Sequence, residues 1–117
     1  MSCNLNYRNV EYRVKSGDKV KLELTFTDSD GLAMNLSNTT SYASGKWKVW
    51  KPNGTLIING TITFENRANG VVSYTTTAAD TAIGNAGIWE GEVEIKDSSN
   101  EISEQTKSFN FIIEQSY

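Results

Sequence analysis

The acidic residues of the chain offer two arrangements that could do chemistry. The first is Asp28-Ser29-Asp30-Gly31, which resembles the start of a calcium loop, where alternate carboxylates present hard oxygens to the ion. The twelfth position of such a loop falls on Thr39, which cannot supply a bidentate carboxylate, and the glycine stands at the fourth position instead of the sixth. We therefore interpret the segment as an ordinary turn and expect no metal site.

The second arrangement is the alternation of Glu90, Glu92 and Glu94. Glycoside hydrolysis needs two carboxyl groups roughly 5 to 9.5 Å apart across a sugar, and side chains two residues apart on a strand are separated by roughly 7 Å. The spacing permits a catalytic pair, but nothing in the sequence indicates a cleft around it. An alternating run of this kind is typical of a solvated strand, so we expect all three glutamates to face solvent.

Other kinds of catalysis lack their usual residues. The chain of 117 residues has no histidine, so the commonest general base, the relay of a hydrolytic triad and the commonest zinc ligand are missing. The single cysteine, Cys3, can form no intramolecular disulfide and has no neighbouring base to activate it. The sequence therefore predicts a protein that is not an enzyme and that holds no cofactor and no metal.

Tryptophan residues are better candidates for a binding site. In the segment 46–50 the strand period of two places Trp47 and Val49 on one face and Trp50 on the other. An alternation of this kind assigns one tryptophan to the core and the second to the surface. We predict that Trp47 is buried and that Trp50 is exposed.

The predicted interaction site consists of Trp50, Tyr42, Lys48 and Lys51. An outward tryptophan between two lysines could stack on a sugar or seat in a partner protein, because tryptophan is enriched at interfaces and at their hot spots. The opposite interpretation is that Tyr42, or the long polar connection 32–45, folds over Trp50 and covers it. The sequence leaves these two alternatives open.

These candidates lie on a pattern of short strands. Alternating apolar runs, each closed by a Gly, Asn or Asp turn, extend from Val10 to Ile113 and leave no room for a long helix. We predict an all-β fold, a single immunoglobulin-like β-sandwich of about seven to eight antiparallel strands. The one domain spans residues 1–117, and residues 1–6 form a flexible N-terminal arm.

Individual turns and the core follow from the same pattern. Asn59-Gly60 is predicted to form a two-residue hairpin, because Asn-Gly favours the type I′ turn. The segment 79–89 looks like the corner that leads into the sixth strand of immunoglobulin sandwiches, with Trp89 where a tyrosine often stands. The residues predicted to pack between two sheets are Trp47, Trp89, Leu22, Leu24, Val93, Ile95, Phe109 and Phe111.

Composition narrows the class of partner. The net charge is −3, with acidic and basic residues interleaved, whereas a nucleic-acid binder would show a basic stripe. No apolar run approaches the ~20 residues that a membrane span needs, and residues 1–6 lack the features of a signal peptide. We therefore expect neither nucleic acid nor membrane as a partner and expect synthesis in the cytoplasm.

Taken in order, the strands and turns are similar to the N-terminal immunoglobulin-like domain of bacteriophage baseplate upper proteins and related phage tail modules. The resemblance covers most of the chain, and the order and spacing of its pieces carry it. Those pieces are Gly17-Asp18 before the strand Val20 to Phe26, Asp30-Gly31, Asn35-Leu36-Ser37, Trp50-Lys51-Pro52-Asn53-Gly54-Thr55, Gly70-Val71-Val72-Ser73-Tyr74, Ala79-Asp80-Thr81, Gly87-Ile88-Trp89-Glu90-Gly91-Glu92-Val93 and Phe109-Asn110-Phe111-Ile112-Ile113.

The resemblance implies an architectural role without catalytic or ligand residues. In that family the domain is usually an attachment module followed by a helical stalk, so this chain is expected to be the module alone, a virion component made in a bacterial host. Its expected partners are phage structural proteins of a baseplate, tail or capsid, and further copies of itself. The expected docking surface is the Trp50 face together with the connection 32–45. The alternative is a carbohydrate-binding or adhesin-like module that stacks sugars on Trp50 and Tyr42.

Overall fold

The computed structural model describes residues 11–106 and 108–115. Cys3 and the predicted N-terminal arm, residues 1–6, lie outside the described residues. The chain forms nine strands and two short 3-10 helices, η1 (Arg67–Asn69) and η2 (Ile83–Asn85). The strands are β1 (Glu11–Lys15), β2 (Lys21–Thr25), β3 (Ser44–Trp50), β4 (Leu56–Thr61), β5 (Thr63–Asn66), β6 (Val71–Thr75), β7 (Gly87–Lys96), β8 (Ile102–Gln105) and β9 (Phe109–Glu114).

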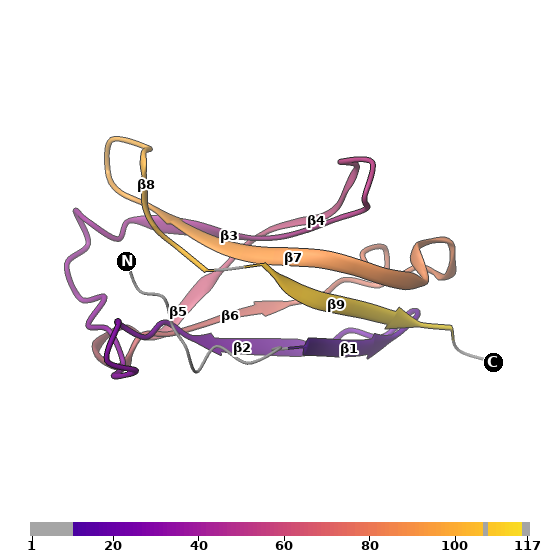
Figure 1. Ribbon diagram of the computed structural model, residues 1–117, viewed down its shortest axis with the longest axis horizontal. Coiled ribbons are helices and arrows are strands. Elements are labelled where there is room, and N and C mark those ends of the chain that lie inside the picture. Colours follow the sequence, from indigo (N-terminus) through magenta and orange to yellow (C-terminus); the bar gives the residue numbers. More distant parts are fainter. Residues whose placement is uncertain (1–10, 107, 116–117) are drawn as a thin grey trace.

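The strands form the two layers of a β-sandwich, as predicted (Figure 1). The larger sheet has the order β1-β9-β7-β3-β4, with β8 paired to the far end of β7, and the smaller sheet has the order β2-β6-β5. Only Ile62 separates β4 from β5, and β8 and β9 pair one after the other with β7. The β-sandwich fold is therefore confirmed, with nine strands in the described residues where about seven to eight were predicted; β4 and β5, and β8 and β9, are pairs of short strands in close succession.

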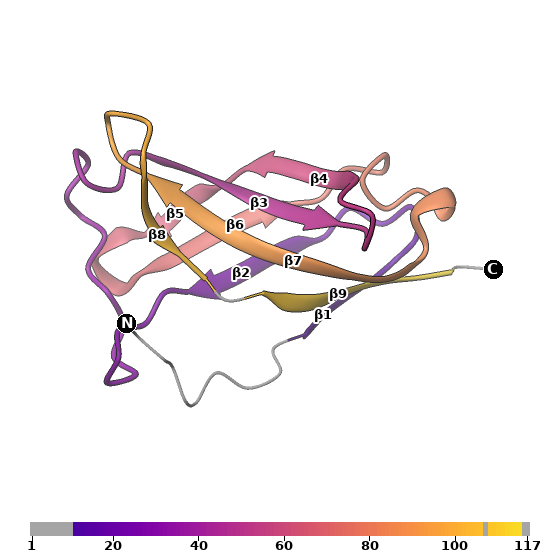
Figure 2. The same ribbon diagram turned by 45° about the horizontal axis from the view of Figure 1, so that its top comes forward.

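One strand pair departs from the antiparallel pattern that was predicted. β1 pairs with β9 in parallel, whereas the other pairs are antiparallel. The Tyr12 hydroxyl on β1 also donates to the Glu23 carbonyl of β2, at 2.9 Å. β1 thus bridges the two sheets on the side of the sandwich where β9 lies, a position that both views show (Figures 1 and 2).

The core confirms the predicted strand phase. Trp47 is fully buried at its centre, with its ring centroid 5.1 Å from that of Tyr12 and 5.6 Å from that of Phe109. Two of the predicted core residues, Trp89 and Leu24, are only half-buried and pack at the edge of the cluster. The predicted residues that are buried are Trp47, Leu22, Val93, Ile95, Phe109 and Phe111.

The predicted Asn59-Gly60 hairpin is wrong. Both residues lie within β4, opposite Lys48 and Trp47 of β3, and Gly60 does not have the positive φ of a type I′ turn. Glycine is required there for another reason. A Cβ atom at position 60 would lie 2.0 Å from Cε1 of Tyr74, so the ring of Tyr74 packs directly on the backbone. Gly60 therefore permits a close approach of the two sheets and does not turn the chain.

The predicted corner before β7 is confirmed. The Trp89 indole Nε1 donates to the carbonyl of Asn85 at 2.7 Å, which fixes the turn through η2 to the start of the strand. Tyrosine hydroxyl groups make the same kind of bond to upstream backbone in immunoglobulin sandwiches. The bond also explains why Trp89 stays at the end of the sandwich, away from its centre.

Candidate interaction surface

The most distinctive surface of the domain lies at one end of the outer face of the larger sheet. Strand register places Trp50 directly opposite Leu56 of β4 on one side and Glu90 of β7 on the other. Ile88 shares the face of Glu90, because it lies two residues before it, and Ile88 pairs with Ile112 of β9. Apolar side chains from four neighbouring strands therefore meet outside the core. We call these residues, Trp50, Leu56, Ile88 and Ile112, the Trp50 patch.

The side chains of the patch differ in how far they are exposed. Ile88 is 67% exposed and Leu56 is 47% exposed, although both are large apolar residues on regular strands. Trp50 is half-buried, so the prediction that it is exposed holds only in part. Ile112 is buried but does not belong to the core cluster, because its side chain lies on the outer face. Trp50 is thus partly covered by its neighbours, and Ile88 is the most exposed residue of the patch.

An ion-pair network borders the patch on the β1 side. Arg13 stands directly opposite Ile112 in the register. Its Nε lies 2.6 Å from a carboxylate oxygen of Glu11, and its Nη1 lies 2.9 Å from one of Glu114. These two carboxylates, Glu11 first, raise the pKa of the exposed Arg13 above its ordinary value. The apolar surface ends at this charged border.

Toward the other end of β7 the outer face is charged, and here one prediction is wrong. Glu94 was expected to face solvent with Glu90 and Glu92, but it is only 4% exposed. Lys48 and Lys96 lie on either side of its carboxylate, at 3.1 and 3.9 Å. Glu92 accepts a hydrogen bond from Gln105 of β8. Because Glu94 is buried between two lysines and Glu92 is bonded to Gln105, the three glutamates do not form an open acidic row.

Among the other predicted interaction residues, only Lys48 lies on the same outer face as Trp50. Lys51 follows the inward phase of β3, and its Nζ lies 5.3 Å from the centroid of the Trp89 ring. Tyr42 precedes the opposite end of β3, and a seven-residue strand is roughly 20 Å long. The structure therefore separates Tyr42 from Trp50, and a single sugar ring cannot contact both of them.

The connection 32–45 also lies at the far end from Trp50 (Figure 1). Neither this segment nor Tyr42 covers Trp50, so this alternative interpretation is wrong, and the connection and Trp50 lie at opposite ends of β3. Leu36 anchors the segment in the core. Arg67 holds it in place, because its Nη1 donates to the carbonyls of Leu36 and Tyr42 at 3.0 and 2.9 Å.

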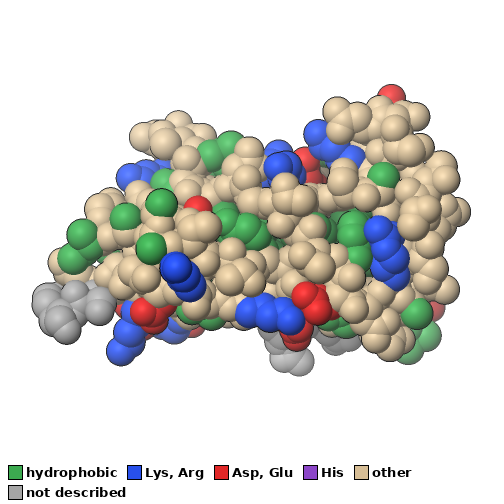
Figure 3. Space-filling view, turned by 180° about the vertical axis from the view of Figure 1, so that it is seen from behind, with side chains coloured by type: hydrophobic (Ala, Val, Ile, Leu, Met, Phe, Trp, Pro, Cys, Tyr) green, Lys and Arg blue, Asp and Glu red, His purple; other side chains and the backbone are tan. Residues whose placement is uncertain are grey.

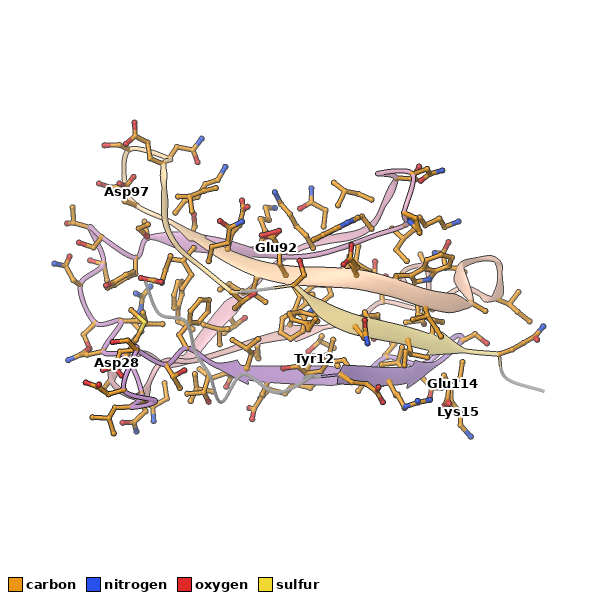
Figure 4. The ribbon with its side chains drawn as sticks, in the orientation of Figure 1. Tyr12, Lys15, Asp28, Glu92, Asp97 and Glu114 are labelled. Carbon is orange, nitrogen blue, oxygen red and sulfur yellow. The ribbon has the colours of Figure 1, made fainter. Side chains whose placement is uncertain are left out.

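The acidic turn at Asp28 is an ordinary turn in its geometry. One carboxylate oxygen of Asp28 accepts the backbone N–H groups of Asp30 and Leu32, at 2.9 and 3.0 Å. Figure 4 shows that Asp28, Glu92 and Asp97 lie on separate parts of the molecule. Within residues 11–106 and 108–115, no three His, Cys, Asp or Glu side chains are grouped so that they could hold a metal ion.

A partly buried polar contact joins the end of β6, the central strand of the smaller sheet, to the turn that follows it. The Tyr74 hydroxyl donates to Asp80 at 2.5 Å, and Asp80 also accepts the backbone N–H of Thr77 at 2.9 Å. Burial, followed by the negative charge of Asp80, raises the pKa of Tyr74 well above its ordinary value. This contact fixes the ring that packs on Gly60.

Three residues of the patch, Leu56, Ile88 and Ile112, were not singled out from the sequence as site residues. Ile88 could have been found, because the alternation that turns Trp89 inward turns Ile88 outward. Leu56 carried no such signal, because an irregularity in the pairing between Val49 and Trp50 sets which residue of β4 faces Trp50. The described residues contain no helix with the length and apolar character needed to cross a bilayer.

Comparison with known proteins identifies the fold. No protein-family model matches the sequence, and no curated protein matches it. Among solved structures, the chain is similar to the N-terminal domain of phage TP901-1 ORF48, with a TM-score of 0.68 and 14% identity over 90% of this chain and 85% of that chain. The expected resemblance to a phage immunoglobulin-like N-terminal domain is thus confirmed at the level of the fold.

Two further structures extend the similarity beyond phage proteins. CopC from Methylosinus trichosporium OB3b gives a TM-score of 0.52 at 12% identity, over 92% of this chain and 86% of that chain. The fibronectin(III)-like modules of Clostridium thermocellum CbhA give a TM-score of 0.50 at 15% identity, over 94% and 95%. The fold is therefore one that very different proteins share, and the surface must carry the argument about function.

Proposed function

We propose that this chain is a non-enzymatic structural module of a phage virion that docks on a larger baseplate, tail or capsid assembly through the Trp50 patch. The observation that carries the docking surface is the position of four apolar side chains on the outer face, where packing of the core does not require them. The similarity in fold to a phage N-terminal domain, over most of both chains, supports the virion as the location.

The composition of the surface fits a protein partner. Specific interfaces combine an apolar centre, often with a tryptophan anchor, and a polar rim. Here Trp50, Ile88 and Leu56 form the apolar part, and Glu90 and the Arg13 network border it. Nucleic acid is a poor fit, because Lys48, the lysine nearest to Trp50 on this face, is already paired with Glu94. Phage structural proteins are the partners that we propose.

The test compares matched substitutions at the two ends of the larger sheet. Ile88→Asn removes the most exposed side chain of the patch, and Ile102→Asn makes the same change at another exposed isoleucine, 53% exposed and opposite Lys96 at the far end of β7. Neither is expected to lower the melting temperature by more than a few degrees. In reconstitution of particles depleted of the protein, Ile88→Asn should weaken attachment by about tenfold, and Ile102→Asn should attach like the wild type.

Two results would contradict the proposal at different levels. Equal occupancy of both variants at limiting concentration would exclude the Trp50 patch as the docking surface. Absence of the protein from purified virions, measured by mass spectrometry, would exclude the structural role itself. A glycan array addresses the carbohydrate alternative directly, since a module that only joins virion proteins should bind no sugar on it.

A further inference from the structure

The edges of the two sheets differ sharply in how they are protected. Unpaired backbone at a sheet edge is a template for another strand, and natural proteins usually block it with charged side chains, proline or bulges. In the described chain the edge strands are β1, β4 and β8 in the larger sheet and β2 and β5 in the smaller one. The sequences EYRVK, KLELT, TFEN and ISEQ of β1, β2, β5 and β8 all contain charged residues. The sequence LIINGT of β4 contains none.

The uncharged stretch extends beyond β4 itself. No charged residue and no proline occurs from Thr55 to Phe64, the segment that crosses from one sheet to the other. Figure 3 shows the molecule from behind, and hydrophobic and uncharged atoms occupy much of the middle of that side. The irregularity in the pairing is confined to the end near Trp50, so residues 58–61 form a regular edge.

The hydrogen-bond pattern shows which backbone groups this edge offers. Gly45 and Ile62 continue the register of β3 and β4, and the Ile62 N–H donates to the Gly45 carbonyl at 3.1 Å. Bonded and non-bonded pairs alternate along an antiparallel ladder, so Gly60 and Ile58 make the next bonds to β3. The N–H and C=O groups of Asn59 and Thr61 therefore point away from β3. They make no hydrogen bond to another residue that the structure describes.

We infer that this edge pairs with β4 of a second copy of the chain, antiparallel about a two-fold axis. A two-fold axis brings an edge strand against itself, and a charge that lies at the axis then faces the same charge of the second copy. β4 carries no charge and avoids this repulsion in every register, whereas each of the other four edge strands carries at least one charge. Lys46 lies on β3 opposite Thr61, and its ammonium group donates to the Thr61 hydroxyl at 3.0 Å on the outer face of the sheet. When the two copies of β4 pair so that facing residues point to the same side of the sheet, the amides of Asn59 and Thr61 are the donors.

The first test is the association state of the full 117-residue chain. Sedimentation velocity over a concentration series up to about 1 mM populates even a weak dimer. Asn59→Glu adds a charge at the edge and gives Lys48, directly opposite on β3, a second carboxylate partner besides Glu94, so the fold should tolerate it. Thr25→Glu is the matched control, because Thr25 is an exposed residue on the edge strand β2. We expect a dimer that Asn59→Glu weakens by at least about tenfold and that Thr25→Glu leaves unchanged.

The second test locates the contact by amide hydrogen exchange. In the dimer the amides of Asn59 and Thr61 should be protected, and in Asn59→Glu the amide of Thr61 should exchange rapidly. The amides of Ile58 and Gly60 should stay protected in both, since they bond to β3. A chain that is monomeric throughout the series, or a dimer in which the Asn59 and Thr61 amides exchange rapidly, would overturn the inference. Either result leaves docking through the Trp50 patch unaffected, because it is measured on particles.

Discussion

Gly60→Ala is the substitution whose effect the structure predicts most sharply. The added Cβ would lie 2.0, 2.3 and 2.7 Å from three carbon atoms of the Tyr74 ring, far inside van der Waals contact. Overpacking of this kind costs about 1 to 3 kcal/mol. A ring that moves to relieve it also loses its bond to the Asp80 carboxylate, a charged hydrogen bond that is worth about 1.5 to 3 kcal/mol. We therefore expect Gly60→Ala to lower the free energy of unfolding by about 3 to 5 kcal/mol.

The measurement is urea unfolding followed by tryptophan fluorescence. Gly84→Ala is the matched control, because a Cβ there meets no atom within 4 Å and the residue has no positive φ; its free energy of unfolding should change by less than about 1 kcal/mol. Combining Gly60→Ala with Tyr74→Ala should recover most of the Gly60→Ala loss, because the clashing ring is gone. Strictly additive losses, or a loss of only about 1 kcal/mol, as for a glycine in an open turn, would refute the packing argument.

Three further predictions concern the core, the long connection and alkaline pH. Trp47→Ala should cost about 3 to 5 kcal/mol, and Trp89→Ala only about 2 kcal/mol, since Trp89 is half-buried; equal losses in urea unfolding would contradict this order. Arg67→Met removes the two side-chain hydrogen bonds from Arg67 to the connection 32–45, so it should cost about 2 to 4 kcal/mol, and chymotrypsin should cleave that connection faster. Because burial raises the pKa of Tyr74, the unfolded chain releases this proton first, and stability should fall as pH rises above about 10. The stability difference from Tyr74→Phe should shrink over the same range, and a difference independent of pH would contradict the assignment.

The sequence predicted the strands and the core because both depend on local alternation. A period of two assigns each residue of a half-buried strand to a face, so the burial of Trp47 and the outward position of Trp50 follow from five consecutive residues. The corner at Trp89 was also readable, since it depends on a bond between residues four apart. Such short-range features need no knowledge of how the two sheets pack.

Features that depend on packing between distant segments could not be predicted. Asn59-Gly60 has the local preference of a hairpin turn, but the ring of Tyr74 from the other sheet needs the glycine within a strand. The burial of Glu94 depends on β8 and on lysines of two strands. The separation of Tyr42 from Trp50 depends on the straight course of β3, although only seven residues lie between them in the sequence.

The two proposed surfaces are related by geometry. A two-fold axis between antiparallel strands of one sheet is perpendicular to that sheet, so the outer faces of both copies point in the same direction. Pairing at β4 would therefore present two Trp50 patches to the same side, with Leu56 of each patch on the paired strand and Trp50 one strand away from it. Two linked weak contacts bind far more tightly than one when the target repeats with matching spacing. Asn59→Glu should then weaken attachment to particles although it leaves the patch intact, and Ile88→Asn should weaken attachment without affecting the dimer. Attachment of Asn59→Glu at wild-type occupancy would show that each copy docks by itself.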